Sequence, residues 1–170
     1  MAEQAAYLAL WLEVIGIYAA EDPLQIAHTQ AVVDYTERIA EQEGLPPRRI
    51  FLLKSAALLH DVGCPAARAA HGKSLPPYQE AEGERIVREL LPKHPEFTAE
   101  EADYLARIVG SHHRLGPAKE LHFEPLFEAD LIVNLLEGYY ARARAEFYRD
   151  KMVTTAAGRK IFDLVFGLGL

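Results

Sequence analysis

Apolar residues spaced three and four positions apart, the period of an α-helix, recur over almost the whole chain. The pattern begins near the N-terminus, where Tyr7, Trp11 and Tyr18 fall on one face of a helix drawn through residues 5–20. A convincing strand, which would show apolar and polar residues in alternation, is not found in the sequence. The sequence therefore predicts an all-α fold.

Glycines, prolines and capping residues divide the chain into about six to eight predicted helices. The most apolar of them, residues 47–61, is expected to be the buried central helix. Residues 64–77 are small, basic and rich in proline and glycine, and we predict a loop of about 14 residues, a length that usually serves a function. The other helices are predicted at about residues 24–43, 78–91, 98–113, 122–151 with a bend at Gly138, and 154–166.

The length of 170 residues suits one domain with one core. The net charge of -7 and the pI of about 5.5 argue against a duplex nucleic-acid binder, which usually has a basic face. They do not exclude a small phosphorylated substrate, because a metal ion can supply positive charge locally.

Two features of the sequence bear on cellular location: the cysteine content and the apolar segment near the N-terminus. Cys64 is the single cysteine, so an intramolecular disulfide is impossible and a reducing compartment is favoured. The apolar residues 5–20 are interrupted by Glu13 and are few for a membrane span, and the start lacks the basic region of a signal peptide. We expect a cytoplasmic protein without a membrane partner.

Histidine and aspartate residues stand in strongly apolar surroundings, where polar groups are costly unless they are paired or bind an ion. His60 and Asp61 follow a run of apolar residues, and both can face one ion if Gly63 ends the helix. His28 lies one turn into a predicted helix, and Asp130 stands among apolar neighbours. Imidazoles and carboxylates are the ligands of metals that activate water. The alternatives are a capped helix end, a structural histidine and a hydrogen-bonded core aspartate.

His112 and His113 are adjacent at the end of the predicted helix 98–113. From there both side chains could reach the same site. The alternative is that they are cations at a helix C-terminus, where the helix dipole favours them.

Taken in order, His28, His60-Asp61 and Asp130 resemble the H…HD…D signature of the HD superfamily of metal-dependent phosphohydrolases. The run 56–63, Ala-Ala-Leu-Leu-His-Asp-Val-Gly, looks like the HDIG variant of that family. The resemblance covers about residues 24–140. It implies a compact HD-domain helical bundle, a single domain over residues 1–170 with flanking terminal helices. It also implies that one divalent metal is held by His28, His60, Asp61 and Asp130.

Some members of that family hold a second metal ion with a histidine on the helix after the loop and a later His-His pair. The later pair matches His112 and His113, but Gln79 stands four residues before Gly83, where the dinuclear relatives have histidine. Glutamine is a poorer ligand for transition metals than imidazole, so we expect one ion, with Gln79, His112 and His113 as a possible second site. The ligand set does not distinguish Mn, Fe, Co, Ni, Zn or Mg.

The expected activity is hydrolysis of a phosphoester in a nucleotide or other small phosphorylated molecule by metal-activated water. Asp61 would orient that water or take its proton, and His112 or His113 would protonate the leaving oxygen. Basic residues in the predicted loop and after the histidine pair are candidate phosphate contacts, although each could instead be a solvated surface charge. These candidates are Arg68, His71, Lys73 and Arg114.

Two other functions are compatible with the same residues. A catalytically silent HD-fold module that binds nucleotides for regulation is favoured by Gln79 and opposed by the complete set of four predicted ligands. A di-iron HD-fold oxygenase would need the second metal site, which Gln79 weakens. The apolar residues 5–20 could pack on the core or form a homo-oligomer.

Overall fold

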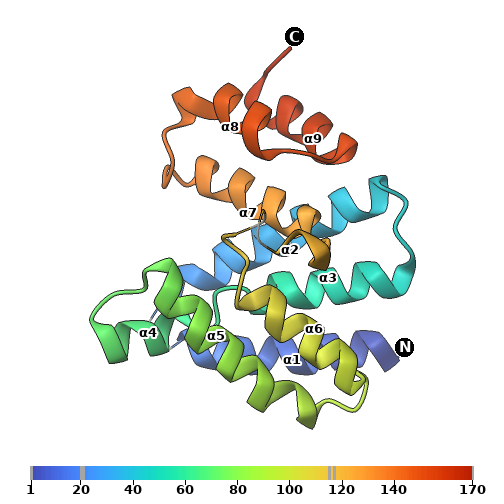
Figure 1. The fold of residues 1–170 in the computed structure, drawn as a ribbon, viewed down its shortest axis with the longest axis vertical. Helices are drawn as coiled ribbons and strands as arrows, with labels where there is room; N and C mark the ends of the chain where they lie inside the picture. Colours follow the sequence, from blue (N-terminus) through green and yellow to red (C-terminus); the bar gives the residue numbers. More distant parts are fainter. Residues whose placement is uncertain (1, 20–21, 115, 117, 170) are drawn as a thin grey trace.

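The computed structural model describes residues 2–19, 22–114, 116 and 118–169 (Figure 1). In these residues the regular structure is entirely helical, which confirms the predicted all-α fold. The α-helices of the described part are α1 (Ala2–Ala19), α2 (Leu24–Gln42), α3 (Pro47–Leu59), α4 (Cys64–His71), α5 (Pro76–Leu90), α6 (Ala99–Val109), α7 (Glu124–Leu136), α8 (Ala145–Met152) and α9 (Ala156–Phe166). Residue 20, the predicted end of the first helix, lies outside the described residues.

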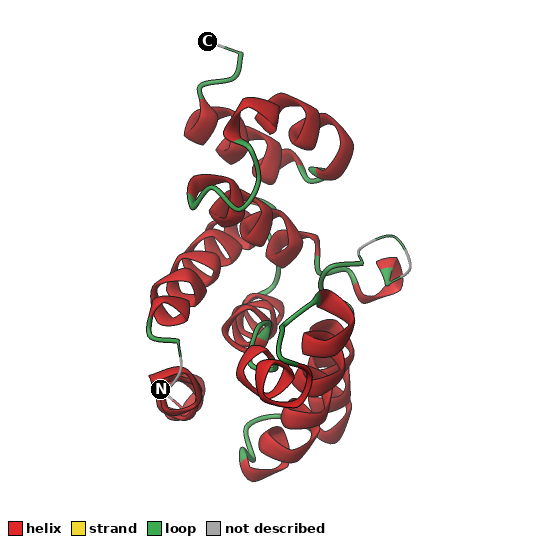
Figure 2. Cartoon of the chain, turned by 90° about the vertical axis from the view of Figure 1, so that its left-hand side faces the viewer, coloured by secondary structure: helices red, strands yellow, loops and turns green. Residues whose placement is uncertain are grey.

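Helices α2, α3 and α7 form the centre of the molecule, with α2 packed against both α3 and α7. Helices α1, α5 and α6 lie on one side of this centre, and α8 and α9 lie at the opposite end (Figures 1 and 2). Helix α4 packs on α5, and α6 packs on both α5 and α3. The centre therefore receives helices from early, middle and late parts of the chain.

Helix α3 is the buried central helix that the sequence predicts. Its apolar residues cover every side of the helix, and Leu53, Ala57 and Leu59 are fully buried. Residues Pro47–His71 are apolar and long enough to cross a membrane by composition alone. However, 78% of the most apolar window is buried inside the fold, as expected of a core helix.

The predicted loop 64–77 is wrong in its first half, because residues Cys64–His71 form α4. Pro65 stands in the first turn of α4, where proline is well tolerated, and alanines with high helix propensity fill the turn that follows. Gly72 ends the helix with a left-handed φ of +71°. The helix forms because this short segment packs on α5.

Two predicted helices are shorter in the structure. The expected helix 122–151 ends at Leu136, since Gly138 has a φ of +81° and Tyr139 donates its backbone N–H to the carbonyl oxygen of Asn134. The predicted bend at Gly138 is thus a complete break. Helix α6 ends at Val109, before the predicted residue 113. The histidine pair consequently lies in the turn after α6.

The C-terminal helices are attached to the centre by two carboxylates, one on α7 and one at the end of α2. Glu128 of α7 is fully buried, and its Oε1 accepts the backbone N–H groups of Thr154 at 2.6 Å and Thr155 at 2.9 Å. Glu43, at the end of α2, accepts the backbone N–H of Ala157 at 2.6 Å. Both acids therefore bind the N-terminus of α9, where the helix dipole favours negative charge.

Glu128→Gln is expected to lower the free energy of unfolding by about 1–3 kcal/mol, because the amide brings a donor towards N–H groups that need an acceptor. Urea denaturation followed by circular dichroism measures the change. Glu41→Gln, at an exposed position of α2, is the control and should change stability by less than about 0.5 kcal/mol. Equal stability of the two variants would contradict the role of Glu128.

Candidate metal centre

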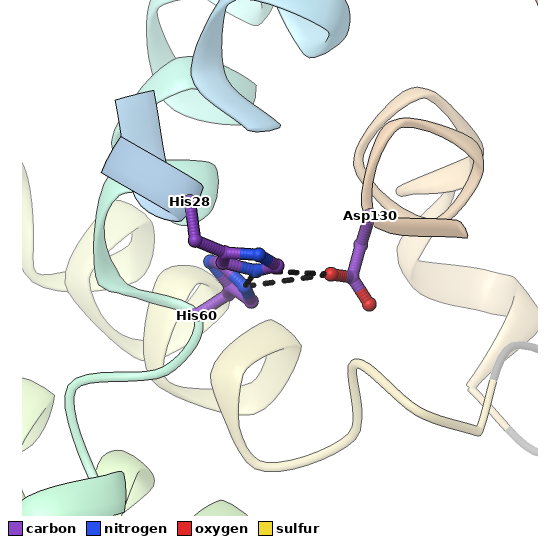
Figure 3. Close-up of side chains that lie close together, drawn as sticks. All are labelled: His28, His60 and Asp130. Atoms are coloured by element: carbon purple, nitrogen blue, oxygen red, sulfur yellow. Dashed lines mark hydrogen bonds and ion pairs between the residues drawn. The ribbon is translucent and has the colours of Figure 1, made fainter. Parts of the chain in front are cut away.

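The four predicted metal ligands come together from three separate parts of the chain. His28 projects from α2, His60 and Asp61 from the turn after α3, and Asp130 from α7. Figure 3 shows the two imidazoles side by side, facing Asp130 on the opposite helix. The Nε2 atoms of His28 and His60 are 3.3 Å apart, and they lie 3.4 Å and 3.7 Å from Oδ1 of Asp130.

Asp61 completes the cluster with its Oδ2, which is 3.3 Å from Nε2 of His60 and 3.8 Å from Nε2 of His28. The ligand atoms of His28, His60 and Asp130 are 3.3–3.7 Å from one another, and a point about 2 Å from all three exists, close to the bond length of a divalent metal to imidazole or carboxylate. Oδ2 of Asp61 lies beside the two imidazoles of this set. The spacing therefore fits one metal ion.

Hydrogen bonds fix which ring nitrogen of each histidine faces the cluster. Nδ1 of His28 lies 2.9 Å from Oε2 of Glu137, and Nδ1 of His60 lies 2.7 Å from the carbonyl oxygen of Ala57. Since those acceptors require N–H groups at Nδ1, both rings direct their Nε2 atoms towards the cluster. The two Nε2 atoms, 3.3 Å apart, can be bridged by a shared proton or by a metal ion that displaces it. The histidines are oriented as metal ligands.

Amide side chains hold the two carboxylates in place. Nε2 of Gln25 donates to Oδ2 of Asp61 at 2.7 Å, and Nδ2 of Asn134 donates to Oδ1 of Asp130 at 2.8 Å. Such partners of metal ligands restrict the orientation of the ligand and lower the entropy that is lost on binding. The cluster is therefore organised by the chain itself.

The electrostatics of the cluster favour a cation. Burial opposes the charged form of His60, but the carboxylates of Asp61 and Asp130 outweigh it and raise the pKa of His60 to about 9. Burial also opposes ionisation of Asp61, but His60 and His112 hold the pKa of Asp61 well below its usual range. The pKa of Asp130 is lowered in the same way, against burial, by His28 and His60. Both carboxylates thus stay ionised and attract positive charge.

The histidine pair after α6 lies on the other side of Asp61. Nε2 of His112 is 3.5 Å from Oδ1 of Asp61, and Nδ1 of His112 lies 2.8 Å from the carbonyl oxygen of Val109. His112 is buried, and its Nε2 has no hydrogen-bond partner among the described residues. Asp61, His112 and His113 each offer a ligand atom within 4.8 Å of the others. The structure therefore brings the proposed second set of ligands next to the first.

Gln79 of α5 lies beside this second set. Its Oε1 accepts the thiol hydrogen of Cys64, and its Nε2 donates to Nε2 of His113 at 3.0 Å. Burial raises the pKa of Cys64, which keeps the thiol protonated as a donor. Gln79 consequently presents an N–H group, not an oxygen, to His113. This N–H group occupies the Nε2 lone pair of His113, which a second metal ion would need. This contact supports the prediction of one ion.

Gln79→His is expected to raise the bound metal from about one to about two ions per chain, because imidazole is the better ligand at this position. Elemental analysis of protein purified without chelators measures the content. Gln79→Leu, which removes the amide without adding a ligand, should keep one ion. One bound ion per chain in both variants would show that residue 79 does not determine how many metal ions the protein holds.

The cluster opens into a cavity of about 550 Å³. His28, Asp61, His113 and Asp130 line this cavity, whereas His112 lies behind it and is buried. The cavity is large enough for a small-molecule ligand.

The predicted phosphate contacts are divided by the structure. Arg68 lines the cavity and lies 3.1 Å from Oδ2 of Asp22. His71 and Lys73 are exposed and do not line the cavity. Arg114 lines a neighbouring cavity, which it shares with His113. Of the four, Arg68 alone lines the cavity of the metal centre, and all four remain predictions as phosphate contacts.

Several residues of the centre are absent from the sequence-based prediction. Asn134 and Glu137 follow Asp130 by four and seven residues, so helical spacing places all three on one face of α7. That spacing is the signal that could have identified them. Tyr139 and Tyr140 also line the cavity, but the predicted continuous helix 122–151 concealed the turn that carries them.

Comparison with known proteins gives the same fold. The sequence matches the HD domain family over residues 26–157. A crystal structure of a predicted HD superfamily hydrolase from an uncultured Thermotogales bacterium is similar, with a TM-score of 0.69 and 22% sequence identity. The superposition covers 94% of this chain and 84% of that protein. No curated protein sequence matches this chain significantly.

Proposed function

This chain belongs to the HD domain family, and we propose that it is a metal-dependent phosphohydrolase acting on a nucleotide or another small phosphorylated molecule. One observation carries the proposal. The Nε2 atoms of His28 and His60 face each other at 3.3 Å beside two ionised carboxylates, and His28, Asp61 and Asp130 line an open cavity. A divalent cation satisfies all four groups at once.

The residues that would hold the metal are His28, His60, Asp61 and Asp130. A divalent ion at this position supplies a Lewis acid and lowers the pKa of water, which is the chemistry that phosphoester hydrolysis needs. Oδ2 of Asp61 points to the histidines of the cluster, which leaves Oδ1 to orient the attacking water. Nε2 of His112 lies beside that oxygen, at 3.5 Å.

His113 is better placed than His112 to give a proton to the leaving oxygen. It lines the cavity, whereas His112 is 3% exposed and is not among the lining residues. Its Nε2 accepts the N–H of Gln79 at 3.0 Å, so proton donation from this nitrogen requires that contact to break. General acid catalysis requires such a side chain within hydrogen-bond reach of the substrate. Arg68 would add a cationic contact at the cavity wall.

The second candidate function is a binding module without turnover. The contact between Gln79 and His113 favours this alternative, because it restrains the histidine that would protonate the leaving group. A di-iron oxygenase ranks below both, since it requires a second metal at the place that Gln79 occupies.

Phosphate release from p-nitrophenyl phosphate and a panel of nucleotides tests the proposal. The protein would be stripped with chelator and reloaded separately with Mn, Fe(II), Co, Ni, Zn or Mg. We expect release with at least one metal and none in the stripped protein. Tight metal binding without release from any substrate would support the binding module.

Metal removal is expected to destabilise the protein, because the ion binds the folded cluster and not the unfolded chain. At a metal concentration about 100 times Kd, the gain in the free energy of unfolding should be about 2.7 kcal/mol. Differential scanning calorimetry with and without chelator measures it. His60→Ala provides the comparison: a metal-dependent stabilisation of equal size in that variant would place the ion elsewhere.

A further inference from the structure

The turn after α7 brings two tyrosines to the cavity of the metal centre. Gly138 has a left-handed φ of +81°, and Tyr139 and Tyr140 both donate backbone N–H groups to the carbonyl oxygen of Asn134, at 2.9 Å and 3.3 Å. Asn134 also holds Asp130 through its side chain. The helix that delivers Asp130 to the cluster therefore also fixes the position of the two tyrosines.

The two rings differ in how much of their surface the protein covers. Their centroids are 5.0 Å apart at an angle of 81°, an edge-to-face contact. Tyr140 also packs on Tyr148 of α8, with centroids 5.2 Å apart. Tyr139 is 74% exposed, and among the described residues Tyr140 is the only aromatic ring that contacts it. Tyr140 thus packs between Tyr139 and Tyr148, whereas the exposed ring of Tyr139 is available to a ligand in the cavity.

The charges that line the cavity restrict how many phosphate groups such a ligand can carry. Four carboxylates line it, from Asp22, Asp61, Asp130 and Glu137. Among the described residues of the lining, Arg68 is the single lysine or arginine, and its charge is offset by Asp22 at 3.1 Å. One phosphate at the metal centre would meet the positive charge of the ion. A further phosphate elsewhere in the cavity would meet carboxylates and be repelled.

We propose that Tyr139 determines specificity by stacking on the base of a nucleoside monophosphate whose single phosphate lies at the metal centre. The position of the phosphate rests on the proposed function, whereas the stacking contact rests on the turn after α7. The cavity of about 550 Å³ lies within the usual range for small-molecule sites. Stacking of a base on an aromatic side chain is expected to raise affinity about tenfold.

Isothermal titration calorimetry on the metal-loaded protein tests this assignment independently of turnover. The ligands are hydrolysis-resistant methylene-phosphonate forms of adenosine 5′-monophosphate, ribose 5-phosphate and ADP. We expect the monophosphate to bind about tenfold more tightly than ribose 5-phosphate, and ADP to bind no more tightly than the monophosphate. Tyr139→Ala should weaken the monophosphate about tenfold and leave ribose 5-phosphate unchanged.

Phe147→Ala is the matched control, since Phe147 is a 47% exposed aromatic residue of α8 that does not line the cavity. It should alter none of the three affinities. Equal binding of the monophosphate and ribose 5-phosphate by the unaltered protein would overturn the assignment. So would an equal loss for both ligands in Tyr139→Ala, the same loss in Phe147→Ala, or tenfold tighter binding of ADP.

Phosphate release from the natural esters separates this inference from the proposed function. If the expected binding pattern is found but no substrate is hydrolysed, the role of Tyr139 is supported and the proposed hydrolase activity is refuted. Equal hydrolysis of adenosine 5′-monophosphate and ribose 5-phosphate, unaffected by Tyr139→Ala, would establish the hydrolase and reject the stacking contact.

Discussion

Asp61→Asn is expected to reduce phosphate release about a thousandfold and to remove most of the bound metal. The substitution replaces the charged oxygen that lies 3.3 Å from Nε2 of His60 with a neutral group. Several kcal/mol of charge stabilisation would be lost with the ion, and each 1.4 kcal/mol corresponds to a factor of ten in rate. Metal analysis and phosphate release on the same preparations measure both effects.

Asp34→Asn provides a closely matched control. Asp34 of α2 is exposed and accepts a hydrogen bond from Nε2 of Gln30 at 2.7 Å, just as Asp61 accepts one from Gln25. The same chemical change at Asp34 should leave metal content and activity unaltered. Retention of both by Asp61→Asn would refute the assignment of Asp61 as a ligand, and loss of both by Asp34→Asn would point to a nonspecific effect of charge.

Gly63→Ala is expected to lower the free energy of unfolding by about 3 kcal/mol or more, with loss of folding as the extreme result. A Cβ atom at Gly63 would lie 2.1 Å from the carbonyl oxygen of Gln79 and 2.4 Å from the backbone nitrogen of Gly83. Both contacts are with the backbone of α5, so no side chain can rotate out of the way. Helix α5 would have to shift as a unit and take Gln79 with it.

Two other glycines calibrate that result. Gly83→Ala should cost less, because its new Cβ meets one side-chain atom, Cγ1 of Val109, at 2.7 Å, and the backbone of Gly63 only at 3.6 Å or more. Gly16→Ala should stabilise the protein by about 0.5–1 kcal/mol, since Gly16 lies inside α1 with no atom within 4 Å of an added Cβ. Chemical denaturation of all three variants measures the series. Equal stability of Gly63→Ala and Gly16→Ala would contradict the close approach.

The requirement for glycine at position 63 links the fold to the metal centre. The turn of residues 60–63 places His60 and Asp61 at the cluster, and Gly63 allows α5 to approach this turn closely. The same approach brings Gln79 of α5 to His113 and Cys64. A substitution at Gly63 is therefore expected to alter the metal centre as well as the stability.

The helical fold and the cluster of ligands were predictable from the sequence because their signals are local. The apolar period identifies α2, α3 and α7, and the apolar surroundings single out His28, His60-Asp61 and Asp130 as candidates. The resemblance to the H…HD…D signature is what joins these candidates as one set of ligands. The capping box at Thr98–Glu101 correctly predicts the start of α6.

Other features depended on contacts between distant parts of the chain. The segment Cys64–His71 is helical and packs on α5, although Pro65 and the glycine and prolines that follow the segment suggested a loop. The amide of Gln79 turns its Nε2, not its oxygen, towards His113. It does so because the oxygen accepts the thiol hydrogen of Cys64, fifteen residues earlier in the sequence. Periodicity cannot report such pairings, because it records which face of a helix is apolar and not which partner covers it.

The sequence by itself determined that the protein is helical and which four side chains are candidates to bind a metal. Only the tertiary structure decided that Arg68 lines the cavity whereas His71 and Lys73 do not, and that Tyr139 stands at the cavity of the same centre. The physical reason is that residue type and spacing set local conformation, whereas the packing of α2, α3 and α7 sets the distances between side chains a hundred residues apart.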